Sequence, residues 1–230
     1  MAEEIAFTRS GALAGARQSL PFVASDFAFG VVYGVLARQA GMSLAEVMLM
    51  SGLVISGSAQ LIVLGLWVSP LPVLAITVTT LVVNLRYLVM GATLRPWFER
   101  LSRFKTYGMV YFLSDENWAL TMREFAAERR DAAFMLGSGI LLTLCWFSFS
   151  VLGYFIGGAV SNPAQWGLDF AFVAVFLALL AGMWKGKADL LPWGAAAVVA
   201  IAAAHWLPGE WYILLGGMVG SLVGALRHGK

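Results

Sequence analysis

The chain has 230 residues, of which 60% are hydrophobic and only 12% are charged, and its formal net charge is +2. A soluble domain carries about 25% charged residues, and long apolar runs recur here from end to end, so the composition predicts an all-α, polytopic membrane protein. The runs are continuous and do not alternate with period two, which excludes a membrane β-barrel.

The numbers of cysteine and histidine residues exclude several kinds of site. Cys145 is the only cysteine, so neither an internal disulfide nor a cysteine metal cluster can form, and His205 and His228 are the only imidazoles. The sequence contains no G-x-x-x-x-G-K-[ST] run. We therefore expect no metal, cofactor, nucleotide or nucleic acid. Glu3 and Glu4 stand where a signal peptide has basic residues, so we expect an uncleaved first segment.

Eight apolar segments make up a single membrane domain, residues 1–230, and each approaches the roughly 20 residues that a helix needs to cross a bilayer. If the basic loops between them all face the cytoplasm, the fourth segment does not cross. The protein then has seven crossings, an outside N-terminus and an inside C-terminus. Arg9 and Arg17 argue for eight, so we favour seven and keep eight open. The segments are Gln18–Ala37, Leu44–Val68, Leu71–Leu94, Tyr107–Phe125, Ala132–Val160, Leu168–Trp184, Leu190–Leu207 and Tyr212–Leu226.

The first segment carries an acidic residue, Asp26, within a tetrapeptide that recurs later in the chain. Asp-Phe-Ala-Phe occupies residues 26–29 and again begins at Asp169. This echo suggests an internal repeat of residues 18–94 and 166–227, with 107–160 between the copies, as in many secondary transporters. The copies would be parallel with seven crossings and inverted with eight. Coincidence between two apolar, Phe/Ala-rich stretches stays an equal alternative.

The second segment contains a run of small and polar residues, which includes Ser56, Gly57, Ser58 and Gln60. Small residues allow helices to approach closely, and hydroxyl groups can bond across helices. The same residues can also let the helix unwind and present backbone groups to a ligand, as the broken helices of transporters do. We favour the second interpretation slightly, because a buried Gln60 amide needs several partners.

The third segment contains Arg86, the most informative residue of the chain. An ionised side chain in hydrocarbon costs ~2.5–3.5 kcal/mol even on the lenient insertion scale, so it is rarely placed there without a partner. One interpretation is that Arg86 extends along the helix towards the interface near Arg95. The other, which we favour, is that it binds a carboxylate of the protein or of a substrate. The protein carboxylates available are Asp26, Asp115, Glu116 and Asp169, and the sequence does not choose between them.

Two polar neighbours of Arg86 are further candidates for a site. On an ideal helix Asn84 and Arg86 are about 200° apart, so they cannot line the same narrow stripe. Tyr87 lies about 300° round from Asn84, on its neighbouring edge. All three are candidate site residues.

The fourth segment has the polar run Ser114, Asp115, Glu116 and Asn117 in its middle. Such a cluster favours a broken, re-entrant or bundle-buried segment, because irregular backbone at membrane depth survives only where protein or water covers it. The two carboxyl groups suit an ammonium-binding or proton-coupling site. The alternative is an interfacial loop anchored by Trp118.

These motifs together resemble the AzlC family of bacterial branched-chain amino acid exporters, over nearly the whole chain. The family signatures read closer to Gly-Ala-Ser-Gln and Thr-Asp-Glu, where this chain has Gly-Ser-Ala-Gln and Ser-Asp-Glu. The resemblance implies efflux of valine-like amino acids across the bacterial inner membrane, together with a small membrane subunit of the AzlD type. The residues that carry it are Leu20-Pro21-Phe22, Phe27-Ala28-Phe29-Gly30, Gly57-Ser58-Ala59-Gln60, Asn84-Leu85-Arg86-Tyr87 with Gly91-Ala92, Ser114-Asp115-Glu116-Asn117 and Trp166-Gly167-Leu168-Asp169-Phe170.

A proton-coupled secondary transporter for apolar amino acids is the function that these residues favour, and we expect no enzyme. One alternative is a non-transporting membrane scaffold whose buried charges are structural ion pairs. The other is an intramembrane serine hydrolase that uses Ser58 or Ser138 with His205. The candidate substrate-binding or coupling residues are Asp26, Ser56, Gly57, Ser58, Gln60, Asn84, Arg86, Tyr87, Ser114, Asp115, Glu116, Asn117 and Asp169.

Overall fold

The structure, a computed structural model, describes residues 5–159, 170, 174, 177, 180–181, 184, 186–207 and 211–228. Every regular element among them is a helix, and the only strand-like pairing in this part of the chain is an isolated bridge between Ala6 and Asp131. The predicted all-α class is confirmed. The helices are α1 (Arg9–Ser19), η1 (Leu20–Phe22), α2 (Val23–Gln39), α3 (Leu44–Leu53), α4 (Gly57–Gly65), α5 (Val73–Thr93), α6 (Arg95–Phe98), α7 (Arg103–Tyr111), α8 (Asp115–Ala126), α9 (Ala133–Ala159), η3 (Lys187–Asp189), α11 (Leu190–Trp206) and α12 (Trp211–His228).

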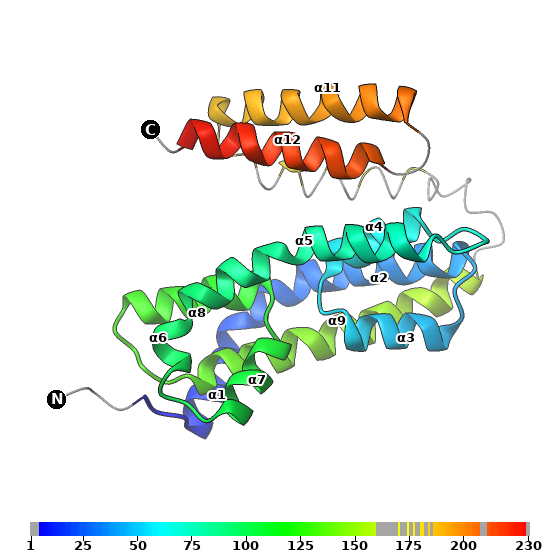
Figure 1. Ribbon diagram of the computed structural model, residues 1–230. Helices are drawn as coiled ribbons and strands as arrows, with labels where there is room; N and C mark the ends of the chain where they lie inside the picture. Colours follow the sequence, from blue (N-terminus) through cyan, green and yellow to red (C-terminus); the bar gives the residue numbers. More distant parts are fainter. Residues whose placement is uncertain are drawn as a thin grey trace.

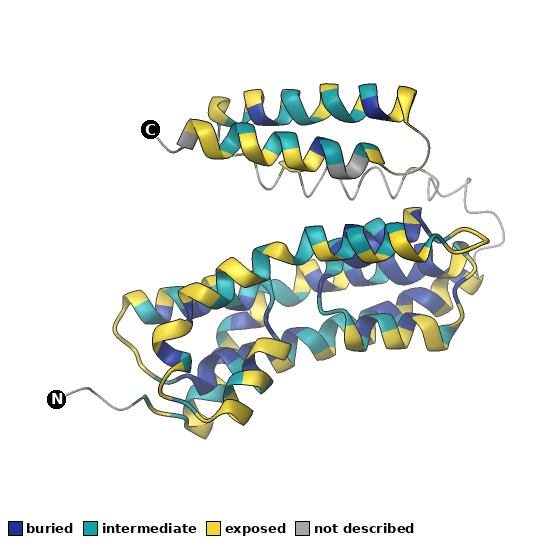
Figure 2. Ribbon diagram, in the orientation of Figure 1, coloured by how far each residue is buried: buried dark blue, intermediate teal, exposed yellow. Residues whose placement is uncertain are grey.

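Within the described part of the chain, four helical stretches are long and apolar enough to cross a membrane: Arg9–Gln39, Val73–Thr93, Ala133–Ala159 and Lys187–Trp206. The shortest has 20 residues, about 30 Å of helix, which matches the hydrocarbon thickness. Apolar side chains are exposed along α5, where Thr79 is the only residue described as buried (Figure 2). This outward apolar surface is what a bilayer solvates.

The predicted total of seven or eight crossings stays a prediction. The second and fourth predicted spans are each divided into two shorter helices, α3 with α4 and α7 with α8. The predicted sixth span lies largely outside the described residues, as does Asp169, so the repeat stays untested. In the predicted repeat, the divided second span corresponds to the seventh span, which is α11 and is one continuous helix.

Helix α9 runs beside α1 and α2 and also contacts α3, α7 and α8 (Figure 1). Glycines permit this close packing. A Cβ atom on Gly34 of α2 would lie 2.1 Å from the carbonyl oxygen of Ser150, and one on Gly153 of α9 would lie 2.1 Å from that of Val31. Only a residue without a side chain fits at such a separation, so the α2–α9 contact is fixed by these glycines.

Helices α11 and α12 pair with each other in the same way, and α12 contacts α5 (Figure 1). A Cβ on Gly216 would meet Ala200, and one on Gly220 would meet Ala196, in both cases within 3 Å. Small residues on both helices therefore form this hairpin.

The chain leaves the helical conformation at two places inside the bundle. Residues 54–56, the first interruption, separate α3 from α4, and Ser56 is extended with φ −154° and ψ 94°. Residues 112–114, the second interruption, separate α7 from α8, and Ser114 is extended with φ −132° and ψ 169°. The Tyr111 hydroxyl donates a hydrogen bond to the carbonyl of Gly52, which ties the helix ends before the two interruptions together.

Candidate functional site

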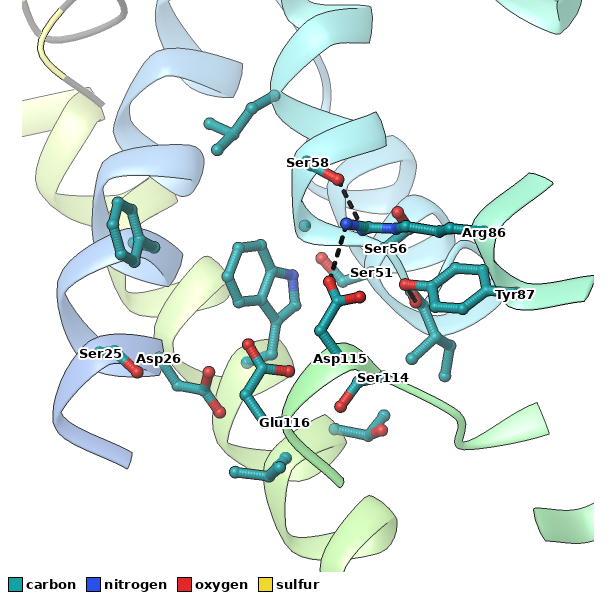
Figure 3. A pocket seen from close by; sticks show the side chains of 17 residues that line it. Ser25, Asp26, Ser51, Ser56, Ser58, Arg86, Tyr87, Ser114, Asp115 and Glu116 are labelled. Carbon is teal, nitrogen blue, oxygen red and sulfur yellow. Dashed lines mark hydrogen bonds and ion pairs between the residues drawn. The ribbon is translucent and has the colours of Figure 1, made fainter. Parts of the chain in front are cut away.

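A cavity of about 430 Å³ lies where α2, α5, α8, α9 and the first interruption meet (Figure 3). Nine of the residues predicted from the sequence line it, so the motifs of the first four predicted spans converge in space. These nine are Asp26, Ser56, Gly57, Ser58, Arg86, Tyr87, Ser114, Asp115 and Glu116.

Arg86 is held inside this cavity by two partners. Its Nη1 lies 2.8 Å from Oδ2 of Asp115, and its Nη2 donates to Oγ of Ser58 at 2.8 Å. The guanidinium carbon also lies 5.2 Å from the centre of the Tyr87 ring. Asp115 is thus the partner that the sequence could not select, and the head group does not extend towards Arg95.

The Arg86–Asp115 pair is accessible from the cavity. The two side chains keep 36% and 42% of their surface exposed, so water and a solute can reach both groups. An ion pair that is exposed to this degree contributes little to stability, because solvent screens it. Its place in the wall of a cavity therefore indicates binding more than structural support.

The N-terminus of α4 opens onto the cavity beside Arg86. Ser56 takes the cap position but its side chain makes no capping hydrogen bond, so the first N–H groups of α4 are left available. Backbone N–H groups and the positive end of the helix dipole favour an anion at such a terminus. Together with the Arg86 guanidinium, they form a place where a carboxylate can bind.

The N-terminus of α8, in contrast, is closed by its own side chains. Oγ of Ser114 accepts from the backbone N–H of Asn117 at 3.4 Å, and Oδ1 of Asn117 accepts from the N–H of Ser114 at 2.9 Å. Asp115 and Glu116 occupy the first turn, where the dipole stabilises negative charge. This side of the cavity presents carboxyl groups.

Two amide side chains that were predicted to bind a ligand instead form hydrogen bonds with the backbone at the two interruptions. Gln60 is fully buried, donates to the carbonyls of Met50 and Val54, and accepts from the indole N–H of Trp146 at 2.9 Å. Asn117, also fully buried, donates to the carbonyl of Phe112 at 2.5 Å. Neither residue lines the cavity. Both side chains donate hydrogen bonds to backbone carbonyls that the broken helices leave unpaired.

We expect Gln60→Leu to destabilise the fold, because it leaves two buried carbonyls and the Trp146 indole without their partners. Each such loss costs about 1–3 kcal/mol. The thermal midpoint of the detergent-purified protein, followed by its size-exclusion peak, should fall clearly. Gln39→Leu is the matched control, because Gln39 is exposed at the end of α2. Equal thermal midpoints for both variants would show that the hydrogen bonds of Gln60 do not stabilise the fold.

The remaining predicted residues differ in how they lie relative to the cavity. Tyr87 donates from its hydroxyl to the carbonyl of Ile55 at 3.1 Å, so it supports the first interruption as well as the cavity wall. Asn84 does not line the cavity. Asp26 does, and it lies on α2 near Glu116 (Figure 3). Asp169 lies outside the described residues.

The serine hydrolase interpretation is not supported by the geometry of its three residues. Oγ of Ser58 is bonded to Arg86, and Oγ of Ser138 to Oγ of Ser19 at 2.6 Å. His205 is exposed on α11 and its ring packs beside Trp206. No described hydrogen bond joins this imidazole to either serine.

Sequence reasoning missed the apolar and weakly polar part of the cavity. Phe29 had a usable signal, because it follows Asp26 by three residues and shares its helix face. The α9 residues had none, since α9 is apolar along most of its length and its cavity-facing side cannot be distinguished by composition. The missed lining residues are Ser25, Phe29, Ser51, Ile55, Leu61, Leu142, Thr143 and Trp146.

Comparison with known proteins agrees with these observations. The chain is 25% identical to the inner membrane protein YgaZ of Escherichia coli, covering 93% of this chain and 89% of the relative. It is 24% identical to the branched-chain amino acid transport protein AzlC of Bacillus subtilis, covering 76% and 70%. A membrane protein of Haemophilus influenzae is also 24% identical, covering 88% and 82%. No solved structure matches the chain.

The family comparison identifies the chain more directly. The model of the AzlC protein family matches residues 21–160, which include α2 to α9 and every described residue that lines the cavity. The relatives from Escherichia coli and Haemophilus influenzae are named as membrane proteins, in agreement with the membrane-length helices. Because the match covers more than half of its residues, the protein belongs to the AzlC family.

Proposed function

We propose that this protein is a secondary transporter that exports branched-chain or related apolar amino acids across the bacterial inner membrane. A zwitterionic amino acid needs a cation for its carboxylate, an anion for its ammonium group and an apolar wall for its side chain. The cavity offers Arg86 with the open α4 terminus, the carboxyl groups of Asp26 and Glu116, and the side chains of Phe29 and Trp146. The proposal rests on this match between the charged and apolar groups of the cavity and those of an amino acid.

The architecture around the cavity supports the same function. Broken helices that meet at a ligand site recur in secondary transporters, where half-helix termini meet the charged groups of the substrate. The cavity volume, about 430 Å³, falls in the range of small-molecule sites, ~300–1,000 Å³. The relative from Bacillus subtilis is named for branched-chain amino acid transport, which makes valine the first solute to test.

Proton coupling is part of the proposal. Asp115 is paired with Arg86, whereas Glu116 lines the cavity and makes no ion pair with the described residues. A carboxyl group that water reaches through a cavity can take up and release a proton during each transport cycle. Glu116 is therefore a better proton carrier than Asp115.

A small membrane subunit of the AzlD type completes the proposed transporter. Helix α5 offers a wide apolar surface for such a partner, with Leu74, Leu81 and Leu88 each more than 60% exposed. The functional test therefore measures efflux of labelled valine from cells preloaded with a valine dipeptide, with this chain alone, with its small partner alone and with both. Faster efflux only with both chains supports the proposal. No effect on any apolar amino acid would contradict it in favour of a non-transporting subunit.

The coupling claim has its own test. In vesicles that contain the complete transporter, Glu116→Gln should remove the dependence of valine efflux on an imposed pH gradient. Valine exchange at equal pH should continue, because Asp26 still offers a carboxyl group to the substrate ammonium group. Asp115→Asn should impair both, because it also removes the partner of Arg86. Unchanged pH-gradient dependence in both variants would exclude these carboxyl groups as proton carriers.

A further inference from the structure

Asp26 is a buried carboxylate whose charge no described residue balances. The residue is only 9% exposed, and its Oδ2 atom has no hydrogen-bond partner in the described part of the chain. It lies on α2 in the wall of the cavity, and its side chain points towards the space beside Glu116 (Figure 3). A buried carboxylate is costly unless a cation or a proton joins it.

The groups that face Asp26 do not supply that cation. Glu116 approaches from α8 and Cys145 from α9, and both are acidic or neutral. Arg86, the cationic side chain that lines the cavity, is engaged by Asp115 and Ser58. The ion pairs found among the described residues do not include Asp26.

From this geometry we propose that Asp26 is the ammonium subsite of the cavity and binds the free α-ammonium group of the substrate. This inference rests on the proposed transport of amino acids and adds to it which carboxyl group of the cavity binds the ammonium group. The substrate carboxylate lies at Arg86 and the α4 terminus, and the ammonium group lies at Asp26. Glu116 adds a second negative charge beside the subsite, which strengthens its preference for a cation.

A subsite of this kind sets the substrate class. An α-amino acid brings a cation to Asp26, whereas the 2-oxo acid of the same carbon skeleton leaves the carboxylate buried and unpaired. Such an unpaired group is expensive, so the site should reject the analogue that lacks the ammonium group. The protein therefore selects valine over 2-oxoisovalerate, although both fit the apolar wall.

The test measures binding of valine and of 2-oxoisovalerate by calorimetry in detergent, for the wild type and for Asp26→Asn. It uses the purified complete transporter, in which this chain is combined with its small membrane subunit. The wild type should bind valine about 10- to 100-fold more tightly than the 2-oxo acid, the range expected for one charge-assisted hydrogen bond. Asp26→Asn should remove this preference by weakening valine binding to the same extent. Affinity for the 2-oxo acid should stay equal or rise.

A matched control and a second readout separate binding from folding. Glu99→Gln also removes one carboxylate, but from an exposed pair with Arg95, and should change neither affinity. Without ligand, Asp26→Asn should raise the thermal midpoint, because it removes an unpaired buried charge. Valine should then raise the midpoint of the wild type but not that of the variant.

Four results would overturn the inference. Equal losses of valine and 2-oxoisovalerate binding in Asp26→Asn would show that Asp26 only shapes the cavity. Unchanged valine affinity together with lost pH-gradient dependence would make Asp26 a proton carrier instead. If the wild type binds the 2-oxo acid as tightly as valine, the ammonium subsite fails while a transport function stands. If the wild type binds no apolar amino acid at all, the proposed function fails with it.

Discussion

Replacing Arg86 with glutamine is expected to reduce valine transport by roughly 100-fold or more, the largest functional effect of any single substitution in the cavity. The substrate carboxylate loses its charge-assisted hydrogen bonds, which are worth ~1.5–3 kcal/mol each. Asp115 also loses its partner and brings an uncompensated negative charge into the site that receives the carboxylate. Exchange of labelled valine in vesicles measures the effect.

The stability of the same variant should change far less than its transport. Removing one partner of a fully buried pair costs ~3–5 kcal/mol, but this pair is more than one third exposed, so screening reduces the cost. The double variant Arg86→Gln/Asp115→Asn should therefore recover the wild-type thermal midpoint without recovering transport. Recovered transport in the double variant would mean that Arg86 is only structural. Arg95→Gln, which removes an exposed arginine from its pair with Glu99, is the control.

Gly34→Leu is expected to have the largest effect on the fold. A side chain at this position meets the backbone of α9 at once, because even a Cβ atom would lie 2.1 Å from the carbonyl oxygen of Ser150. Extra volume in a well-packed core costs ~1–3 kcal/mol when side chains can adjust, and a backbone collision costs more because two helices must separate. The variant should lose its monodisperse size-exclusion peak.

The matched control is Gly91→Leu on α5. Nothing lies within 4 Å of a Cβ atom at Gly91, so leucine should be tolerated and should favour the helix by ~1 kcal/mol over glycine. If Gly34→Leu behaved like this control, the close α2–α9 contact would be wrong, and the wall of the cavity that these two helices form would be wrong with it.

The sequence was most informative where a polar residue interrupts an apolar run. The cost of a polar group in hydrocarbon is local, so Arg86, Asp115 and the Ser56–Gln60 run could be recognised without any knowledge of their neighbours. The same reasoning predicted an unwound second segment as one of two alternatives, and the structure has the interruption. It could not foresee that Gln60 hydrogen-bonds to the carbonyls of Met50 and Val54, because a buried amide group can bind either a ligand or the unpaired carbonyls of a broken helix.

The partner of Arg86 and the apolar residues that line the cavity could not be predicted, because both depend on contacts between segments that are distant in the sequence. Four carboxylates were equal candidates for Arg86 until the fold placed Asp115 at 2.8 Å. Trp146 lines the cavity and bonds to Gln60, yet its surroundings in the sequence resemble any other apolar helix. The number of crossings stayed open for another reason, since Arg9 and Arg17 near the N-terminus and the basic loops between the segments favour different totals.

The two interruptions have a consequence for the length of the helices that flank them. Helices α3 and α4 have ten and nine residues, about 15 Å and 14 Å, so each reaches across only half of a ~30 Å hydrocarbon layer. Helices α7 and α8, with nine and twelve residues, are similarly short. Neither α3 nor α4 alone could therefore cross such a layer, and the cavity, which both of them line, lies where these two half-length helices meet.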